Sequence, residues 1–359
     1  MGGTNGKGSV ATLAYAALRA AGCSVGLYTS PHLVDVRERM IVDDRPIGRT
    51  AFAGWTARLL PEIERTQASF FEATTAIAFA DFAARRVDVA VIEVGLGGRL
   101  DCTNVITPLA SGVTTIAREH TEYLGDALDG IAREKAGIAK PNVPFVIGEP
   151  DAALADVLAQ VAESAGARVT RVPAETTYAG PLGLAGPHQR RNAAVAAALL
   201  DALPAPWRPA PEAVARGFAR ARLPGRLDRR GHWLFDVAHN PAGLGVLLAA
   251  LREAPPMRPV HGLVGILRDK DWRTMVEMLV GAIDGLWLTT PPSAPADRRW
   301  DLDEVRRTDR SSARPPIIQP DFDAALRDVQ HGAGTILVTG SFHTVGDALA
   351  RLPGFAPLG

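Results

Sequence analysis

Short apolar runs alternate with amphipathic stretches along the whole chain, which is the pattern of a parallel sheet covered by helices on both faces. In the first half, apolar runs predict strands at Ser24–Ser30, Val87–Val94, Ala110–Ala117 and Pro144–Gly148. Apolar positions at helical spacing predict helices at Gly8–Ala21, Ala73–Arg86, Ala127–Ala139, Ala152–Ala165 and His188–Ala202. The first half is therefore expected to be an α/β domain.

The alternation restarts after a turn-forming segment, Leu223-Pro224-Gly225-Arg226. Further strands are predicted at Trp233–Val237, Val260–Ile266, Gly285–Thr289, Pro316–Gln319 and Thr335–Gly340, with helices between them. A chain of 359 residues is too long for one ordinary core. We expect two domains, 1–222 and 223–359, and the second is a doubly wound, Rossmann-like α/β unit.

Composition excludes several classes of function. The chain has 39 basic and 39 acidic side chains, so no net charge attracts nucleic acid or an anionic membrane. Cys23 and Cys102 are the two cysteines, too few for a disulfide framework or a cysteine-based zinc site, and they suit a reducing compartment. No run of about 18 apolar residues is present. We expect a soluble, cytoplasmic, monomeric protein whose partners are small molecules.

The chain begins with a glycine-rich loop of the kind that binds phosphate. Gly3, Gly6 and Gly8 let backbone N–H groups approach a polyphosphate closely. Lys7 adds a cation, and Ser9 offers a hydroxyl suited to Mg²⁺ or to a phosphate oxygen. The loop departs from the common G-x-x-x-x-G-K-[ST] form because a glycine separates the lysine from the serine. The alternative interpretation is a glycine-rich turn that binds nothing.

Three possible metal ligands follow three of the predicted strands. Ser30 ends one strand, Glu93 lies at the end of the next, and His120 comes just beyond the third. Ligands bind at the carboxyl edge of open parallel sheets, and Mg²⁺ prefers oxygen ligands. Glu93 is therefore a candidate Mg²⁺ ligand. The alternatives are a solvated residue at a strand end for Glu93 and a structural histidine for His120.

A lysine interrupts the apolar face of one predicted helix. Leu128, Ile131, Lys135 and Ile138 fall on one face of the helix that begins at Ala127. Either the Lys135 side chain reaches along the surface to solvent, or it is desolvated. A desolvated lysine needs a partner, deprotonation or a covalent change.

The second half carries its own polar strand end. The segment Phe235-Asp236-Val237-Ala238-His239-Asn240-Pro241 places an acid at the end of a strand, before a polar turn and a helix. The segment Gly265–Asp271 repeats this arrangement one strand later. Asn-Pro is a common turn, so Asn240 alone indicates little.

Together these segments resemble the folylpolyglutamate synthases and dihydrofolate synthases of the Mur ligase superfamily. The resemblance runs from Gly3 to about Gly346. The matching segments are Gly3-Thr4-Asn5-Gly6-Lys7-Gly8-Ser9, Thr29-Ser30-Pro31-His32-Leu33, Glu38-Arg39, Phe71-Glu72, Glu93 to Asp101, Thr103-Asn104, His120, Leu124-Gly125, Glu134-Lys135-Ala136-Gly137-Ile138, His188-Gln189, Asn192-Ala193, Pro224-Gly225-Arg226, Ala238-His239-Asn240-Pro241 and Asp269-Lys270-Asp271. Their common order and spacing make the resemblance specific.

The resemblance implies a P-loop-containing Mur ligase central domain, a parallel sheet with helices on both faces, followed by a Rossmann-like C-terminal α/β domain. It implies an ATP-dependent amide ligase of folate biosynthesis and one-carbon metabolism. ATP would phosphorylate a carboxylate of dihydropteroate or of a tetrahydrofolate, and the amino group of L-glutamate would attack the acyl phosphate. Such chemistry requires exclusion of water and neutralisation of negative charge.

The resemblance also assigns residues to ligands. The ATP contacts it implies are Asn5, Gly6, Lys7, Gly8, Ser9, Asn192, Arg226 and Asp236. One Mg²⁺ would be held by Ser30, Glu93 and His120, and Lys135, carbamylated in the family, would support a second. Carbamylation converts a cation into an anion, which would account for a lysine on an apolar face. The pterin is expected at Ser69, Phe70, Phe71, Glu72, Leu100, Asp101 and Cys102, and the nucleotide between the two domains.

The chain departs from the family pattern at a few positions. Glu119 stands where the family usually has Asp, Ser69 where it has Thr, and Val237 where it has Gly. The larger departure is at the front, because the strand that presents the loop in the family is missing before Met1. Losing about five buried apolar residues forfeits on the order of 10 kcal/mol, comparable with a domain's whole stability. We hypothesise a misassigned start, in which a valine codon, GUG, is read as Met1.

Two other functions remain open at this point. One is another Mur-type ligase that acts on a peptidoglycan precursor or a different acid, which the segments Phe71-Glu72 and Leu100-Asp101 disfavour. The other is a truncated nucleotide-binding remnant without catalysis.

Overall fold

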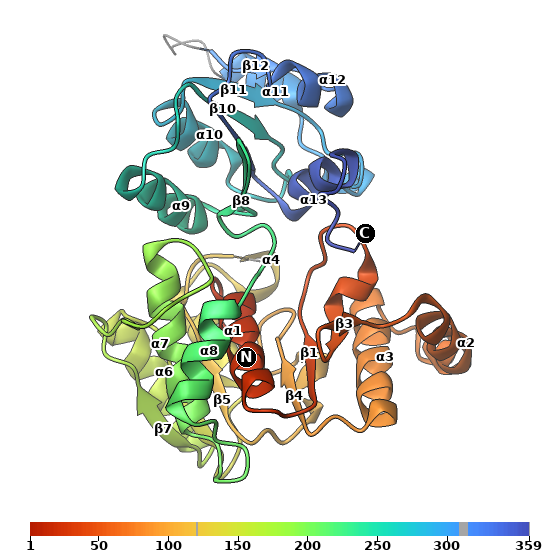
Figure 1. The fold of residues 1–359 in the computed structure, drawn as a ribbon, viewed down its shortest axis with the longest axis vertical. Helices are drawn as coiled ribbons and strands as arrows, with labels where there is room; N and C mark the ends of the chain where they lie inside the picture. The colour runs from red at the N-terminus through yellow and green to blue at the C-terminus, as the bar shows by residue number, and fades with distance from the viewer. Residues whose placement is uncertain (120, 309–314, 359) are drawn as a thin grey trace. The chain divides into compact units, whose positions relative to one another are not determined.

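The computed structural model describes residues 1–119, 121–308 and 315–358, and the chain divides into two compact units (Figure 1). The first unit comprises Met1–Pro31 and Val36–Arg222, and the second comprises His32–Asp35 and Leu223–Gly359. Both units are α/β, as the alternating pattern predicts. The segment His32–Asp35 lies in the first half of the sequence but belongs to the second unit, which hydrophobic periodicity does not predict.

The first unit contains two groups of strands. Its strands are β1 (Val25–Tyr28), β2 (Met40–Val42), β3 (Arg45–Pro46), β4 (Val89–Ile92), β5 (Ser111–Val113), β6 (Pro144–Ile147) and β7 (Arg168–Arg171). One sheet has the order β3-β2-β1-β4 and the other the order β5-β6-β7. All pairs are parallel except those that β2 makes with β1 and β3. The hairpin β2–β3 is absent from the sequence-based prediction because its strands are too short to show alternation.

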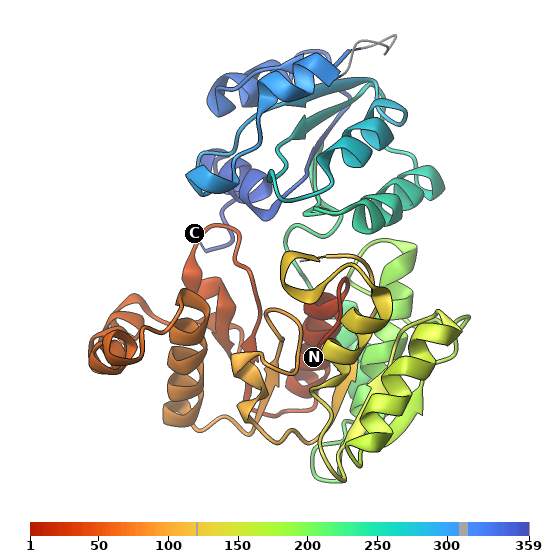
Figure 2. The same cartoon turned by 180° about the vertical axis from the view of Figure 1, so that it is seen from behind.

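Residues Met1 to Gly3 lie between the two sheets. The Met1 amino group donates to Ile92 O at 2.6 Å, and Val94 N donates to Met1 O. On the other side, Gly2 N donates to Gly112 O and Thr114 N donates to Gly2 O. The first residues therefore act as a very short parallel strand between β4 and β5, and Figures 1 and 2 both show the N-terminus there.

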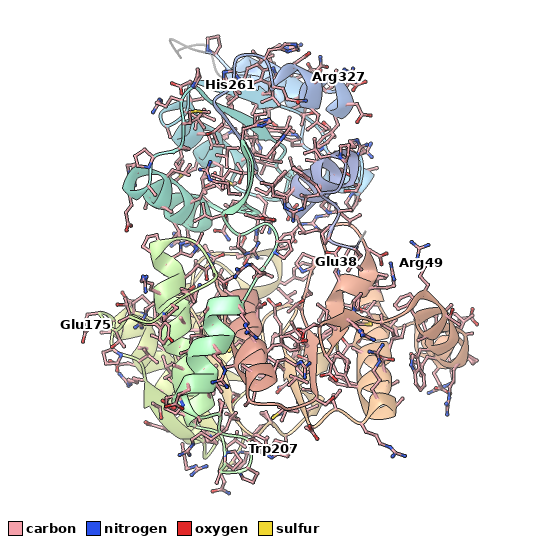
Figure 3. The ribbon with its side chains drawn as sticks, viewed as in Figure 1. Glu38, Arg49, Glu175, Trp207, His261 and Arg327 are labelled. Carbon is pink, nitrogen blue, oxygen red and sulfur yellow. The ribbon has the colours of Figure 1, made fainter. Side chains whose placement is uncertain are left out.

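Helices cover both groups of strands. They are α1 (Lys7–Ala20), α2 (Arg49–Thr66), α3 (Phe70–Arg85), α4 (Thr121–Leu124), α5 (Leu128–Ala136), α6 (Ala152–Ser164), α7 (Pro187–Asp201) and α8 (Pro211–Arg220). Helix α1 is buried along most of its length and lies beside α7 and α8. Helix α2 has no buried residue and extends from the edge of the unit, where Arg49 marks its start (Figures 1 and 3).

The second unit is a doubly wound sheet. Its strands are β8 (Asp228–Arg230), β9 (Trp233–Phe235), β10 (Val260–Val264), β11 (Gly285–Leu288), β12 (Ile317–Ile318) and β13 (Thr335–Thr339). Their order is β12-β11-β10-β13-β9-β8, and β8 alone among these strands is antiparallel to its neighbour. Its helices are α9 (Pro241–Glu253), α10 (Trp272–Val280), α11 (Leu302–Thr308), α12 (Phe322–Asp328) and α13 (Phe342–Arg351).

Two apolar clusters stabilise the sheet of the second unit from its two faces. One cluster joins α9, α10 and α11 to the sheet through residues such as Leu244 and Met275. The other joins α12 and α13 to the sheet through Phe322 and Val345. Within the described part of the chain, no helix has the length and hydropathy needed to cross a bilayer.

Candidate active site

The glycine-rich loop is held in place by the carboxyl end of β5. Thr4 N donates to Thr115 O at 2.6 Å, and Thr4 Oγ1 accepts from Ala117 N at 3.0 Å. Thr114 Oγ1 donates to Asn5 O at 2.7 Å. Helix α1 begins at Lys7, immediately after this fixed loop. The free N–H groups of a helix start and the positive end of its dipole therefore face the loop, which is the arrangement that binds phosphate.

Two glycines of the loop have backbone conformations that other residues rarely adopt. Gly3 has φ 130° and Gly6, the N-cap of α1, has φ 90°. A Cβ on Gly6 would lie 2.7 Å from Asn192 Oδ1, and one on Gly3 would lie 1.9 Å from Thr114 Oγ1. The loop and Asn192, both predicted to contact ATP, are therefore in close contact, and only glycine leaves room between them.

Glu93 lies against the same loop. Its carboxylate accepts from Ser30 N at 3.1 Å, and a Cβ on Gly8 would lie 3.5 Å from Glu93 Oε2. The Glu93 residue is only 4% exposed, which excludes the interpretation of a solvated residue at a strand end. Two of the three predicted Mg²⁺ ligands, Ser30 and Glu93, are thus brought together. The third, His120, lies outside the described residues.

Lys135 is buried and points at the loop. It lies in α5, is 4% exposed, and its Nζ donates to Gly3 O at 3.0 Å. This excludes the alternative in which the side chain reaches solvent along the surface. Of the two alternatives left open by the sequence, the structure shows the desolvated lysine.

The charge of Lys135 is destabilised where it lies. The pKa of Lys135 is lowered to about 7, mainly by burial and also by the nearby positive charge of Lys7, while the carboxylates of Glu119 and Asp101 act in the opposite direction. Lys7 Nζ donates to Gly3 O, also at 3.0 Å, and to Thr4 O. A substantial fraction of Lys135 is therefore neutral near pH 7.

The residues of this region fit a nucleotide phosphate and a divalent cation. The cradle of Gly3, Gly6 and Gly8 is closed to any added Cβ at its first two positions, and the buried carboxylate of Glu93 is a hard oxygen ligand. Among the described residues, no group of three His, Cys, Asp or Glu side chains gathers as a metal site. Of the three predicted ligands, Ser30 is not one of these four residue types and His120 lies outside the described residues, so Glu93 alone is counted in such a search.

The two segments predicted to bind the pterin lie in contact. Helix α3 begins after Ser69, and the loop that follows β4 packs on it, because a Cβ on Gly95 would lie 2.4 Å from the Phe71 ring. Cys102 Sγ donates to Thr75 Oγ1 at 3.4 Å across the same junction. Phe70 and Leu100 are 59% and 79% exposed, so each segment presents a large apolar side chain to solvent.

Several residues assigned to the pterin also have clear structural tasks. Ser69 and Glu72 form a reciprocal cap of α3, in which Glu72 Oε2 accepts from Ser69 N at 2.7 Å. These bonds lower the pKa of Glu72. Asp101 is buried, and its two oxygens accept four hydrogen bonds, from Gly95 N, Leu96 N, Thr103 N and Thr103 Oγ1. The spacing S-x-x-E before an apolar helix is the signal that would have predicted the cap.

In the second unit, Asp236 organises the turn that carries Arg226. Its oxygens accept from Leu227 N and Ala238 N, each at 2.9 Å. Burial raises the pKa of Asp236, and the positive charge of Arg226 opposes this. The Arg226 guanidinium lies 5.0 Å from the centre of the Phe342 ring, which also packs against His239. Arg226 and Asp236, both predicted to contact ATP, are thus neighbours within this unit.

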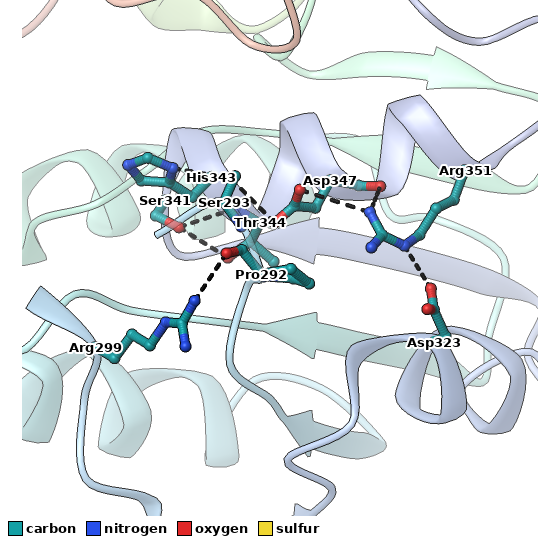
Figure 4. A network of polar contacts seen from close by, with 9 residues as sticks. All are labelled: Pro292, Ser293, Arg299, Asp323, Ser341, His343, Thr344, Asp347 and Arg351. Atoms are coloured by element: carbon teal, nitrogen blue, oxygen red, sulfur yellow. Dashed lines mark hydrogen bonds and ion pairs between the residues drawn. The ribbon is translucent and has the colours of Figure 1, made fainter. Parts of the chain in front are cut away.

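A polar network at the same sheet edge was missed by sequence reasoning. Ser293, which follows β11, contacts two residues of α13: its Oγ donates to Asp347 Oδ2 at 3.0 Å and lies 3.0 Å from His343 Nδ1 (Figure 4). Arg351 pairs with Asp347 and Asp323. In a nucleophilic triad the aspartate contacts the histidine, and the other ring nitrogen of the histidine faces the serine. Here both His343 Nδ1 and Asp347 contact Ser293, so this network is not such a triad. The network fixes the loop after β11 to α13.

Comparison with known proteins identifies the family. The Mur ligase middle domain matches residues 1–180, and the Mur ligase glutamate ligase domain matches residues 225–342. The folylpolyglutamate synthase of Lacticaseibacillus casei is 38% identical over 82% of this chain and 76% of its own length. The chain belongs to the folylpolyglutamate synthase/dihydrofolate synthase family. It is therefore an ATP-dependent carbon–nitrogen ligase of the Mur type.

Solved structures of this family share the fold of the whole chain. Escherichia coli FolC in complex with DHPP and ADP is 31% identical with a TM-score of 0.86, over 97% of this chain and 86% of that one. A bifunctional folylpolyglutamate synthase/dihydrofolate synthase with Mn, AMPPNP and L-glutamate bound is 30% identical with a TM-score of 0.85, over 97% and 87%. The predicted fold class and family are thus confirmed. The two alternative functions, another Mur-type ligase and a nucleotide-binding remnant without catalysis, are not favoured.

Proposed function

We propose that the chain joins L-glutamate to dihydropteroate, to a tetrahydrofolate, or to both, through an acyl phosphate formed with ATP. The observation that carries this proposal is that Lys135 and Glu93, both buried, lie against the same glycine-rich loop. Two related structures with adenine nucleotides, one also with Mn and L-glutamate and the other with DHPP, support the same ligand set. The names of the relatives support the substrate class.

The loop and α1 would bind the ATP phosphates. Asn5, Gly6 and Gly8 offer backbone N–H groups, and Lys7 and Ser9 add a cation and a hydroxyl at the start of the helix. Asn192 limits the space behind Gly6, which would orient the nucleotide. Arg226 and Asp236 are proposed as further ATP contacts from the second unit. ATP supplies the phosphoryl group that activates the substrate carboxylate, and glutamate displaces it as phosphate.

Ser30 and Glu93 would hold a Mg²⁺ ion together with His120. The Glu93 carboxylate is already oriented by Ser30 N, so binding would require little rearrangement. A divalent cation there would neutralise charge on the phosphates. A second ion is proposed beside Lys135.

Lys135 would be carbamylated. Its lowered pKa leaves neutral amine near pH 7, and a neutral amine can attack CO₂. The Nζ–C bond forms, one proton leaves to solvent, and the cation becomes a carboxylate anion. This change removes the repulsion with Lys7 and creates an oxygen ligand for a metal.

The pterin would lie against the exposed apolar side chains of Phe70 and Leu100. These residues stand on either side of the junction between α3 and the loop after β4. This surface would be shaped from behind, through the cap and the hydrogen bonds described above, by Ser69, Phe71, Glu72, Asp101 and Cys102. A flat aromatic ligand suits such a surface, because stacking on apolar side chains buries area with few polar demands.

The proposed setting is the cytoplasm, where the protein would act as a monomer on small molecules, without a nucleic-acid or membrane partner. A net charge of zero supports the exclusion of polyanionic partners. Cys23 and Cys102 are both free in the described part of the chain, which suits a reducing compartment.

A substrate comparison tests this function. The purified protein is incubated with ATP, Mg²⁺ and glutamate, and with dihydropteroate or tetrahydrofolate as acceptor, and the products are analysed by mass spectrometry. We expect the mass of one glutamyl residue to be added to at least one acceptor. A nucleotide-sugar acid that is glutamylated while both pterins are left unchanged would overturn the proposal.

A further inference from the structure

Arg39 is a buried cation to which the proposed function gives no task. It ends the short 3-10 helix η1 (Val36–Arg39) and is 8% exposed, whereas Arg37 of the same turn is only half-buried. An arginine stays charged even in a protein interior. Because burying a charge is costly unless it interacts with an anion or another polar group, the surroundings of Arg39 indicate what it is there to bind.

The backbone of Arg39 is fixed beside one of the proposed Mg²⁺ ligands. Thr29 N donates to Arg39 O at 3.1 Å, and Thr29 immediately precedes Ser30, whose N–H donates to the Glu93 carboxylate. Burial lowers the pKa of Arg39, and the negative charge of Glu93 is among the interactions that oppose this lowering. The guanidinium is therefore within electrostatic reach of the proposed metal site.

The guanidinium of Arg39 also contacts the surface proposed for the pterin. It lies 5.3 Å from the centre of the Phe70 ring, and Phe70 is 59% exposed. Tyr28 hydrogen-bonds the Arg39 side chain. The Tyr28 hydroxyl lies 2.9 Å from Thr75 Oγ1, to which Cys102 Sγ donates. Arg39 thus belongs to the junction between α3 and the loop after β4.

This placement suits the recognition of a carboxylate. In the proposed reaction the acceptor reaches from the pterin surface to the phosphate of ATP, and the end that reaches the phosphate is a carboxylate. A planar guanidinium can lie over an aromatic ring with its face and still use its N–H groups for an anion. Its fork of N–H groups matches the two oxygens of a carboxylate, with two parallel hydrogen bonds.

We propose that the Arg39 guanidinium, supported by the Phe70 ring, binds the carboxylate of the acceptor that is to be phosphorylated. The inference rests on the proposed function and names the group that recognises the reacting end of dihydropteroate or of a tetrahydrofolate. Two N–H···O bonds would fix which carboxylate oxygen faces the phosphate of ATP. Arg39 would also select acceptors that carry a negative charge over neutral analogues of the same shape.

A comparison of dihydropteroate with its carboxamide tests this proposal. The carboxamide keeps the pterin and nearly the same shape but lacks the negative charge. Binding of each compound is measured by calorimetry, with Mg²⁺ and a nonhydrolysable ATP analogue present, for the parent protein, Arg39→Gln and Arg39→Lys. Arg45→Gln is the matched control, because Arg45 is exposed in the neighbouring strand β3. Thermal unfolding of each variant checks that it is folded.

We expect Arg39→Gln to weaken the binding of dihydropteroate by at least about 10-fold and that of the carboxamide by less than about 3-fold. Arg39→Lys keeps the charge without the fork, so it should weaken only the binding of dihydropteroate, by about 3-fold or more. If Arg39→Gln does not fold, the two affinities of Arg39→Lys decide in the same way. Arg45→Gln should change neither affinity.

An equal loss of affinity for both compounds in the Arg39 variants would overturn this inference, because Arg39 would then act only on the structure of the site. Unchanged binding of dihydropteroate would overturn it as well. In both cases the proposed function would stand, since the parent protein binds the acceptor. A parent protein that binds neither compound would instead overturn the proposed function, together with the inference that rests on it.

Discussion

Lys7 and Lys135 donate hydrogen bonds to the same acceptor, the carbonyl oxygen of Gly3, each at 3.0 Å. Burial lowers the pKa of Lys135, and the positive charge of Lys7 beside it lowers this pKa as well. The lowered pKa of Lys135 and its proposed carbamylation both follow from this arrangement.

The stability of the protein should rise with pH above 7. The pKa of Lys135 is about 7 in the folded protein and 10.5 when unfolded, so between these values the unfolded chain binds more protons. From pH 7 to pH 9 this contributes about 2 kcal/mol to the free energy of unfolding. The measurement is urea unfolding in CO₂-free buffer, compared with Lys135→Met. If the two proteins show the same pH dependence, Lys135 is not the group responsible.

Replacing Lys135 by Ala should lower turnover by at least about 100-fold while ATP still binds, because a proposed metal-supporting anion is lost. Turnover is followed by ADP release, and ATP binding by calorimetry. Lys140→Ala is the matched control, since Lys140 contacts Asn104 O and not the loop. Activity of Lys135→Ala within a few-fold of the parent would contradict the carbamate assignment.

Gly6→Ala should weaken ATP binding by at least about 10-fold, since Gly6 has φ 90° and an added Cβ would meet Asn192 Oδ1. Gly22→Ala is a close control. Gly22 has φ 95° but nothing lies within 4 Å of an added Cβ. Both variants should lose about 1 kcal/mol of stability from the backbone conformation. Equal ATP affinities in the two variants would show that the space beside Asn192 is not used by the nucleotide.

Glu93→Gln should weaken Mg²⁺ binding by at least about 10-fold, because the amide keeps an oxygen for Ser30 N but loses the negative charge. Binding is measured by titrating Mg²⁺ in the presence of a nonhydrolysable ATP analogue. Glu163→Gln, on the exposed side of α6, controls for a general change in charge. An unchanged Mg²⁺ affinity would remove Glu93 from the proposed ligand set.

The sequence singles out the candidate site residues that are charged but stand within an apolar sequence pattern. Lys135 interrupts an apolar stripe and Glu93 ends an apolar run, so the hydrophobic pattern alone singles out each of them. Both are buried, and their parts in ligand binding stay predictions. Asn192 could be assigned to the ATP site only through the resemblance, and its contact with Gly6 appears only in the structure, because a contact across so many residues leaves no local sequence pattern.

Other features are absent from the prediction. Helix α2 has no fully buried residue, but Phe52, Trp55 and Leu59 recur at helical spacing and pack, partly buried, against a core cluster, so this periodicity was a usable signal. The helix α13 residues His343 and Asp347 meet Ser293 through the order of the strands, which a sequence pattern does not reveal. Asp101 was assigned to a ligand, whereas both of its oxygens accept hydrogen bonds within its own loop. Its part in pterin binding stays a prediction.

The most direct test of the ligase mechanism is the dependence of ADP release on its co-substrates. The purified protein is given ATP and Mg²⁺ with the pterin acceptor alone, with L-glutamate alone, or with both, and ADP and the glutamylated product are counted together. We expect sustained ADP release only with both co-substrates, at one ADP for each glutamate joined. Equal ADP release without glutamate would contradict the proposed mechanism.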